Sequence, residues 1–382
     1  MQHRKLRLFV DIVVSAVTDS GPEWRLSGAS PHAKGIRVTA AASTLQTFPL
    51  DGAPAPFLAA DVGGTHVRIG LVRAGNPHGP AIEVLDYRKY RNAEFASLGA
   101  ILADFASHNP PVRQCVIATA GYALADGTVI TANVPWPLSA SRIRDELGFE
   151  AVHLVNDFEA VAHAAAHIDG SQVLQLTGPA QAPRGPTLVV GPGTGLGAAV
   201  WIPLGNRSVV LATEAGQASL AAGTELEMAV LQQMLRGRSH VSIEYGALSG
   251  PGLFNLYTAL CAVRGAAPAH ATPDAVSAAA CNGSDPLAEE TLQLFCGILG
   301  STIGDMALLY GVHGGIYLAG GILPKIGPFI QRSSFVERFL NKGPMSKALQ
   351  DIPVKLVEHG QLGVIGAASW YLEKSADRPL AT

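Results

Sequence analysis

Two stretches of the chain repeat one pattern of apolar and polar positions: an apolar run, a glycine-rich turn and a second apolar run. FLAADVGGTHVRIGLV spans residues 57–72, and TLVVGPGTGLGAAVWIPL spans residues 187–204. Apolar runs of this length, bounded by glycine or proline, are typical of strands joined as hairpins. The pattern therefore predicts one architectural unit used twice, once per domain, with a ligand cleft between the two copies.

The rest of the periodicity predicts alternating strands and helices. Thr224 and Glu227 form a capping-box pattern at the start of a helix over residues 224–235. A buried strand is expected over residues 115–121, and a strand end that enters a helix over residues 153–167. A long apolar helix is expected over residues 291–311, and a strand followed by a Gly-Gly turn and a helix start over residues 315–326.

Length, charge and cysteine usage limit the class of protein. A chain of 382 residues exceeds the size at which one core usually stops growing, so two domains are expected. The formal net charge of -3 leaves no basic excess to grip a nucleic-acid backbone. Every apolar run is interrupted well short of about 20 residues, which predicts no membrane span. The four cysteines lack C-x-x-C spacing, which favours a reducing cytoplasm over a zinc site or a secreted disulfide framework.

Residues 1–56 differ from the rest of the chain. They are rich in Ser, Thr, Ala and Pro after a short apolar run that follows Arg4, Lys5 and Arg7. A signal peptide starts in this way, but Asp11 lies within the apolar run and no clear small-residue cleavage site follows. We expect a disordered extension or a misassigned start, with a targeting segment as the alternative.

The first glycine turn carries candidate chemistry. Asp61 ends an apolar run, and Gly63, Gly64 and Thr65 follow it. Glycines let a backbone approach a ligand closely, their N–H groups bind phosphate oxygens, and a carboxylate beside them can hold Mg²⁺. A tight hairpin with a turn-favouring Asp explains the same residues, and the stretch alone does not decide between the two.

The second turn, GPGTGLG, is open to three interpretations. It lacks the Lys of a P-loop, which excludes that motif. Gly193, Gly195 and Ala198 satisfy G-x-G-x-x-A, and Glu214 lies near the spacing of a ribose-binding acid. A strand pattern follows the glycines instead of a helix, however, so no helix N-terminus would face a pyrophosphate. A hairpin that holds phosphate fits better than a dinucleotide site.

Several polar residues have two interpretations each. Asp157 precedes a helical apolar stripe, where it is either an N-cap or a base at the carboxyl end of a strand. Glu214, Glu244 and Asn133 are isolated among small or apolar residues, which is consistent with a polar ligand or with a loop surface. His240 is interpreted as structural, and Cys296 as a core residue.

Taken together and in order, seven motifs resemble those of the bacterial glucokinase family, which belongs to the hexokinase and actin-like ATPase superfamily. They are DVGGTHVR, TANVPW, LVNDFEAVA, VVGPGTGLG, EAGQASL, HVSIEYGALSGPGL and YLAGGILPK. The resemblance covers residues 57–374. It implies an α/β protein with the two-domain actin-like (ribonuclease H-like) fold and a ligand cleft between the domains. The small domain would comprise residues 57–167 plus about 355–374, and the large domain residues 168–354.

The resemblance also implies an activity, the transfer of phosphate from ATP to the 6-hydroxyl of glucose, and roles for particular residues. Asp157 would be the general base, and Asp61 would position Mg²⁺ through water. The ATP-binding residues would be Asp61, Gly63, Gly64, Thr65, Gly193, Thr194, Gly195, Gly320 and Gly321. The sugar-binding residues would be Asn133, Asn156, Asp157, Glu214, Gln217 and Glu244. The family further suggests a homodimer.

Two positions depart from the family pattern. The family's EGGH reads Glu214-Ala215-Gly216-Gln217, so Gln217 stands where a sugar-contacting histidine is usual, and His66 replaces the usual Asn after GGT. Glutamine can donate and accept hydrogen bonds but carries no charge. Gln217 therefore keeps two alternatives open, a kinase for another hexose or aminosugar and a non-catalytic sugar or ATP sensor.

Overall fold

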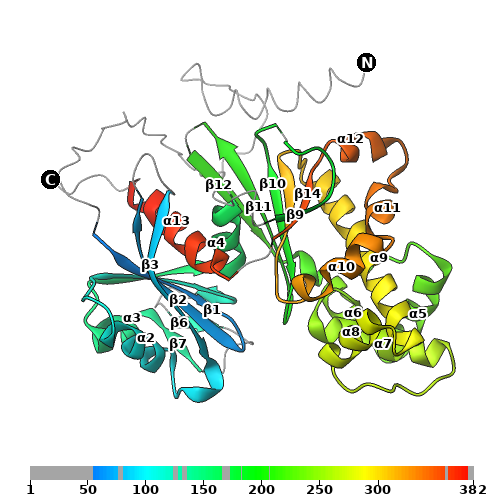
Figure 1. Cartoon of the computed structure of the whole chain (residues 1–382), viewed down its shortest axis with the longest axis horizontal. Coiled ribbons are helices and arrows are strands. Elements are labelled where there is room, and N and C mark those ends of the chain that lie inside the picture. Colours follow the sequence, from blue (N-terminus) through cyan, green and yellow to red (C-terminus); the bar gives the residue numbers. More distant parts are fainter. Residues whose placement is uncertain are drawn as a thin grey trace, which may run out of the picture. The chain divides into compact units, whose positions relative to one another are not determined.

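The computed structural model describes residues 55–75, 81–123, 128–130, 136–165, 173–181, 183–205, 207–357 and 360–376. By their contacts Pro54–Thr382 form one compact unit (Figure 1). The extension predicted for residues 1–56 lies outside the described residues, except for Ala55 and Pro56.

The first half of this unit is built on a five-stranded sheet with the strand order β3-β2-β1-β4-β8. β1 to β3 form an antiparallel meander, and β4 and β8 run parallel to β1. The strand bounds are Phe57–Val62, His66–Ala74, Ile82–Arg91, Gln114–Thr119 and Ala151–Asn156 for β1, β2, β3, β4 and β8. This arrangement confirms the first predicted hairpin, the buried strand after residue 115 and the strand end before residue 157.

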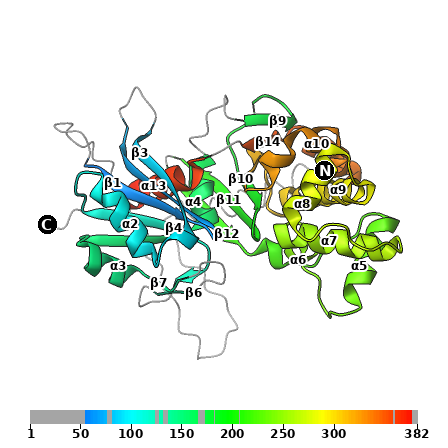
Figure 2. The ribbon, with the colours of Figure 1, turned by 60° about the horizontal axis from the view of Figure 1, so that its bottom comes forward.

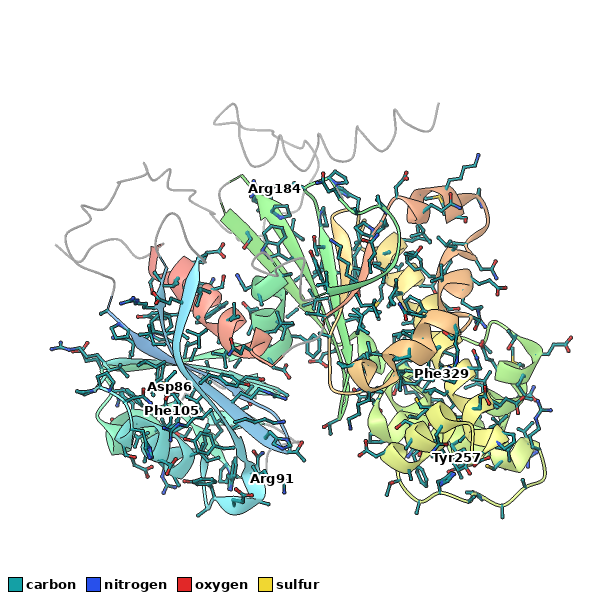
Figure 3. The ribbon with its side chains drawn as sticks, in the orientation of Figure 1. Asp86, Arg91, Phe105, Arg184, Tyr257 and Phe329 are labelled. Carbon is teal, nitrogen blue, oxygen red and sulfur yellow. The ribbon has the colours of Figure 1, made fainter. Side chains whose placement is uncertain are left out.

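Alternation along β1 decides what each face of this sheet contacts. Leu58, Ala60 and Val62 pack under α2 (Leu98–Ser107) and α3 (Ala140–Leu147), in the cluster that holds Phe105 (Figure 3). The alternate residues Phe57 and Ala59 face α4 and α13, which span Asp157–Ala164 and Leu362–Ala376. Because side chains alternate along a strand, Asp61 points to the α4 and α13 side.

The second sheet repeats the first. Its order is β12-β11-β10-β13-β14-β9, in which β10, β11 and β12 form an antiparallel meander while β13 and β14 run parallel to β10. β9 adds an antiparallel edge strand. The bounds are Val173–Thr177, Thr187–Pro192, Leu196–Leu204, Arg207–Thr213, Gly315–Leu318 and Val354–Val357 for β9 to β14 in that order. The first five strands match the first sheet in order and direction, so the predicted duplication is confirmed.

Helices α4 and α13 pack between the two sheets. Ala160 and Val364 contact the first sheet, whereas Ala162 and Leu362 pack with Val189 of the second. Figures 1 and 2 show the two helices side by side in this position. The junction of β8 and α4 is therefore held between the sheets, and Asp157 begins α4.

The second half also carries most of the helices. They are α5 Glu225–Leu235, α6 Ile243–Gly246, α7 Gly250–Val263, α8 Pro273–Asn282, α9 Pro286–Leu309, α10 Gly327–Arg332, α11 Phe335–Leu340 and α12 Ser346–Gln350. Their core includes Tyr257 and Phe329 and confirms the burial expected for Cys296 (Figure 3). Four short 3₁₀ helices, η1 Asn92–Glu94, η4 Ala215–Gln217, η5 Leu323–Ile326 and η6 Gly343–Met345, and a small sheet of β5 Tyr122–Ala123, β6 Thr128–Ile130 and β7 Leu138–Ser139 complete the described elements.

Two expectations from the sequence need correction. Thr224 caps α5, since its hydroxyl accepts from the Glu227 N–H at 3.1 Å. The Glu227 carboxylate does not close the capping box, because it accepts from Gly223 N and pairs with Arg338. The prediction that every apolar run is too short to span a membrane fails for α9, which is long and apolar enough by length and composition. Two thirds of its most apolar window is buried, as in the core helix of a globular protein.

The predicted domain boundaries remain a prediction, because Pro54–Thr382 form one compact unit. The segment expected to complete the small domain contains two elements with different contacts. β14 pairs with β13 in the six-stranded sheet, whereas α13 packs on α4 and β1.

Candidate functional site

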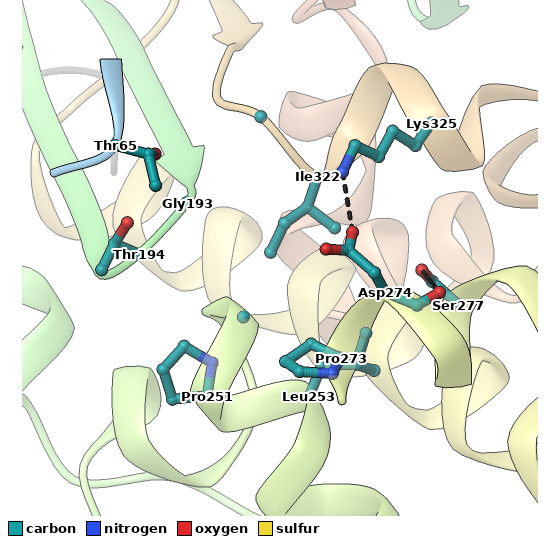
Figure 4. A pocket seen from close by; sticks show the side chains of 12 residues that line it. Thr65, Gly193, Thr194, Pro251, Leu253, Pro273, Asp274, Ser277, Ile322 and Lys325 are labelled. Carbon is teal, nitrogen blue, oxygen red and sulfur yellow. Dashed lines mark hydrogen bonds and ion pairs between the residues drawn. The ribbon is translucent and has the colours of Figure 1, made fainter. Parts of the chain in front are cut away.

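Three glycine turns that are far apart in the sequence meet around one cavity of about 300 Å³. We call it the glycine-turn cavity (Figure 4). Its lining includes Thr65 from the first hairpin, Gly193 and Thr194 from the second, and Gly321 from the turn after β13. The structure thus brings together residues of all three predicted ATP-binding segments.

The second hairpin turn is held from outside by a carboxylate. Gly193 N donates to Gly195 O at 2.8 Å, and Glu244 Oε2 accepts from Leu196 N at 2.8 Å. A β-carbon on Gly195 would lie 2.7 Å from Glu244 Oε2, so a larger residue there would displace this carboxylate from the turn. Ser242 caps α6 by accepting from Tyr245 N, which fixes Glu244 in the first turn of that helix.

An ion pair lies at the far end of the glycine-turn cavity. Lys325 Nζ is 2.7 Å from Asp274 Oδ1, and both side chains are exposed (Figure 4). Ser277 lines the cavity beside them. Asp274 stands in the first turn of α8, which begins with Thr272 as its N-cap. Sequence reasoning missed all of these residues, and the only local signal was the Lys that follows the Gly-Gly turn.

A second cavity of about 380 Å³ contains two carboxylates, and we call it the carboxylate cavity. Asp61, Arg68, Lys89 and Asp157 line it together with Gly320, Gly321 and the start of α13 at Leu362 and Gly363. Gly321 also lines the glycine-turn cavity, so the two cavities adjoin.

Gly320 joins the turn after β13 to the second hairpin. Its φ is +96°, which favours glycine, and a β-carbon there would lie 2.5 Å from Pro192 O. The turn can therefore approach β10 this closely only with glycine at residue 320.

Asp61 is held by a cation from the next strand. Arg68 is its direct partner across the first hairpin, and Arg68 Nη1 lies 3.0 Å from Asp61 Oδ2. Burial raises the pKa of Asp61, while the charge and hydrogen bond of Arg68 oppose that rise. A β-carbon on Gly363 would lie 2.4 Å from Asp61 Cγ, so the start of α13 closes tightly over the carboxylate.

Asp157 lies where β8 ends and α4 begins. The N-cap of α4 is Asn156, whose Oδ1 accepts from the N–H groups of Phe158 and Glu159, each at 3.0 Å. Asp157 Oδ1 also accepts from Phe158 N at 2.9 Å. Burial raises the pKa of Asp157 to about 6, and the negative charges of Asp61 and Glu214 add to the rise. A carboxylate with such a pKa can accept a proton near neutral pH.

The ring of Phe158 fixes α4 against the second hairpin. A β-carbon on Gly197 would lie 1.8 Å from this ring, and one on Gly191 would lie 2.7 Å from it. Because Phe158 directly follows Asp157, this contact sets the position of the carboxylate relative to the second glycine turn.

The predicted sugar-binding loop packs beside the same hairpin. Glu214 and Gln217 are both exposed, at either end of η4. A β-carbon on Gly216 would lie 2.8 Å from Leu196 O, so this loop follows the second hairpin closely. His240 Nε2 is 3.2 Å from Gln217 O, a contact that fits the structural role expected for this histidine. Asn133 lies outside the described residues.

The dinucleotide interpretation finds no support in the geometry. The residues after Gly193 and Gly195 form the strand β11, which pairs with β10 and β12. No helix N-terminus follows the glycines, so the arrangement that holds a pyrophosphate in a dinucleotide-binding fold is missing from this stretch.

Comparisons with known proteins agree with this arrangement. The glucokinase family model matches residues 58–374. A glucokinase-like protein of Xylella fastidiosa strain 9a5c is 57% identical over 320 residues, which cover 84% of this chain and 96% of the relative.

Two solved structures extend the comparison. The crystal structure of a glucokinase from an Antarctic psychrotroph has 36% identity and a TM-score of 0.73, and the match covers 83% of this chain and 98% of that one. A ROK family glucokinase of Streptomyces griseus, solved in complex with glucose and AMPPNP, has 21% identity and a TM-score of 0.55, with 82% and 98% covered, and shows the fold alone. The chain thus has the two-domain actin-like ATPase fold of sugar kinases, and it belongs to the glucokinase family.

Proposed function

We propose that the protein transfers the γ-phosphoryl group of ATP to the 6-hydroxyl of glucose, giving glucose 6-phosphate and ADP. The observation that carries this proposal is the position of Asp157, a carboxylate with a pKa of about 6 in a cavity that adjoins the glycine turns. Phosphoryl transfer needs alignment, neutralisation of charge and a group that accepts the proton of the attacking hydroxyl.

ATP would occupy the glycine-turn cavity. Its phosphates would lie against the backbone of the Gly63-Gly64-Thr65 and Gly193-Thr194-Gly195 turns. Because glycine has no side chain, a phosphate can approach the backbone N–H groups of these turns closely. The nucleoside would extend toward Gly321 and the Lys325–Asp274 pair at the other end. The AMPPNP-bound structure of the ROK family glucokinase supports a nucleotide on this fold.

Asp157 would act as the general base. Its pKa of about 6 means that the carboxylate is mostly ionised at neutral pH yet retains useful basicity. It would accept the proton of the sugar's 6-hydroxyl as that oxygen attacks the γ-phosphorus. Asn156, which makes the cap of α4 with its Oδ1, keeps its amide Nδ2 as a donor for a sugar hydroxyl.

The residues present fit Mg²⁺. The described residues contain no cluster of three or more His, Cys, Asp or Glu side chains that could hold a metal. Mg²⁺ usually keeps several waters and binds one or two carboxylates plus substrate phosphates, so Asp61 suffices, through water, once ATP is bound. The ion would neutralise charge on the transferring phosphoryl group.

Glucose would lie between Asp157 and the loop of Glu214 and Gln217, with Glu244 of α6, Asn133 and Asn156 as further contacts. The charge of Glu214 adds to the rise in the pKa of Asp157, which supports a position of this loop near the proposed base. The exposed Gln217, at the family's histidine position, favours a second candidate, the same reaction on another hexose or aminosugar. We further propose that the protein is cytoplasmic and that it forms a homodimer. Light scattering of the purified protein tests the homodimer.

A coupled ADP-release assay tests the activity with Mg-ATP and glucose, mannose, fructose or glucosamine. The expected result is fastest turnover on glucose, with a product whose C6 carbon shows coupling to phosphorus by NMR. A different preferred sugar would support the second candidate. Binding of sugar or ATP without ADP release on any sugar would contradict kinase activity and indicate a sensor.

A further inference from the structure

The side chain of one buried residue holds the first glycine turn. Asn92 begins η1, directly after β3, and is only 3% exposed. Its Nδ2 donates to Gly63 O at 2.9 Å and to Gly64 O at 3.0 Å, and its own backbone N donates to Thr65 O at 3.0 Å. A single residue therefore binds three consecutive carbonyl groups of the turn. The opposite amide orientation would place an oxygen against two carbonyl oxygens, so these contacts fix the orientation.

This arrangement decides where the N–H groups of the turn point. In a planar trans peptide the N–H points opposite to the C=O. Because the carbonyls of Gly63 and Gly64 point toward Asn92, the N–H groups of Gly64 and Thr65 point away from it. Neither N–H has an acceptor within the described part of the chain, and Thr65 lines the glycine-turn cavity. Adjacent N–H groups aimed the same way form a concavity that binds anions.

The amide oxygen of Asn92 indicates that this residue has a role beyond packing. Asn92 Oδ1 is buried and has no hydrogen-bond partner among the described residues. An unpaired buried acceptor destabilises a fold, whereas an apolar residue at this position would avoid that loss. The contribution of Asn92 therefore lies in the two donor bonds that orient the turn.

We propose that Asn92 is a positioning residue for the phosphate groups of the nucleotide, acting through the Gly63-Gly64-Thr65 turn without touching the ligand. The inference rests on the proposed binding of ATP in the glycine-turn cavity. It does not depend on which sugar is phosphorylated, since Asn92 contacts the first hairpin and not the loop of Glu214 and Gln217.

The test compares nucleotides with and without phosphates on the full chain. In Asn92→Ala we expect the Kd of a non-hydrolysable ATP analogue, measured by calorimetry, to rise about tenfold, as the loss of two neutral hydrogen bonds allows. The Kd of adenosine should stay within about twofold, because the nucleoside end of the cavity is unchanged. The KM for glucose should also stay unchanged while the KM for ATP rises.

Asn109→Ala is the matched control. Asn109 Nδ2 likewise donates two bonds, to Asp86 Oδ2 on β3 at 2.9 Å and to Phe105 O at 3.0 Å, but does not reach the glycine turn. Its ATP affinity should match that of the wild type. Asn92→Ser and Asn92→Asp replace the alanine variant in this test if that variant does not fold. The serine hydroxyl can donate one hydrogen bond to the turn, so the Kd of the ATP analogue should be intermediate. The aspartate carboxylate can donate none, so the Kd should rise as in the alanine variant.

Two results would overturn the inference: unchanged binding of the ATP analogue in Asn92→Ala, or an equal loss for the analogue and adenosine. Because these are binding measurements, they are independent of turnover. The wild-type protein could show no sugar kinase activity while its binding of ATP still depends on Asn92. That result would contradict the proposed function but would support this inference.

Discussion

Arg68 lies directly opposite Asp61 across the first hairpin, with 3.0 Å between guanidinium Nη1 and carboxylate Oδ2. Lys89 is in turn the strand partner of Arg68, so an acid and two bases form one row across β1, β2 and β3. All three residues line the carboxylate cavity. Within this row, the charge and hydrogen bond of Arg68 oppose the burial that raises the pKa of Asp61.

Replacing Arg68 should destabilise the fold in a pH-dependent way. In Arg68→Gln the pKa of Asp61 rises further, because the opposing cation is gone. An acid with a raised pKa in the folded state destabilises the fold above its unfolded pKa, and this loss disappears as pH falls and the acid protonates. Chemical denaturation should show a loss of about 2 kcal/mol at pH 8 and little at pH 4.

Arg73→Gln provides the control for this prediction, since Arg73 pairs with Glu83 at 2.8 Å across the neighbouring strands β2 and β3, in a more exposed position. Its effect should stay below about 1 kcal/mol at both pH values. If both variants lost the same free energy of unfolding, the Arg68–Asp61 ion pair would stabilise the fold no more than an ordinary surface ion pair.

Asp157→Asn should make the protein more stable at neutral pH while it inactivates the enzyme. Burial raises the folded-state pKa of Asp157 to about 6 from 3.8, so the ionised side chain costs about 3 kcal/mol at pH 8. The amide keeps an oxygen for Phe158 N and carries no charge. Melting temperatures at pH 8 and pH 4 check this. A stabilisation of the same size at both pH values would contradict the raised pKa.

The hairpins and the strand-to-helix junction were predictable because each depends on a local pattern of apolar residues and glycines. Asp157 could be proposed from its position before an apolar stripe, but the cap that Asn156 makes beside it could not. Asn92 had no local signal, because its contacts with Gly63 and Gly64 depend on how β3 pairs with β2. The capping box failed for a similar reason, since Arg338 on a distant helix takes the Glu227 carboxylate.

Gly197→Ala should displace Asp157, the proposed base. The added β-carbon would lie 1.8 Å from the ring of Phe158, so α4 must shift away from the second hairpin. We expect kcat to fall at least about tenfold, since a displacement of about 1 Å is enough for such a loss. Adding Phe158→Leu to Gly197→Ala should restore part of kcat, because the smaller side chain relieves the clash.

Gly237→Ala is the control for that pair of variants, because no atom lies within 4 Å of a β-carbon there. It should leave kcat unchanged. If Gly197→Ala also left kcat unchanged, the contact of Phe158 with the second hairpin would have no role in positioning Asp157.

Gln217→His should lower the KM for glucose. A histidine side chain restores the residue type found in the family motif at a position that is exposed beside Glu214. Steady-state kinetics at saturating Mg-ATP measure the change, and Gln232→His on the exposed side of α5 is the control. An unchanged KM for glucose would show that the histidine position does not set sugar affinity in this protein.

The proposed mechanism depends on Asp157, which would accept the proton of the glucose 6-hydroxyl during phosphoryl transfer. The most direct test is the rate of ADP release by Asp157→Asn at saturating Mg-ATP and glucose, with glucose binding measured in parallel. We expect a loss of about 10³-fold in kcat with glucose still bound, as for the removal of a general base. A rate within about tenfold of the wild type would contradict this mechanism.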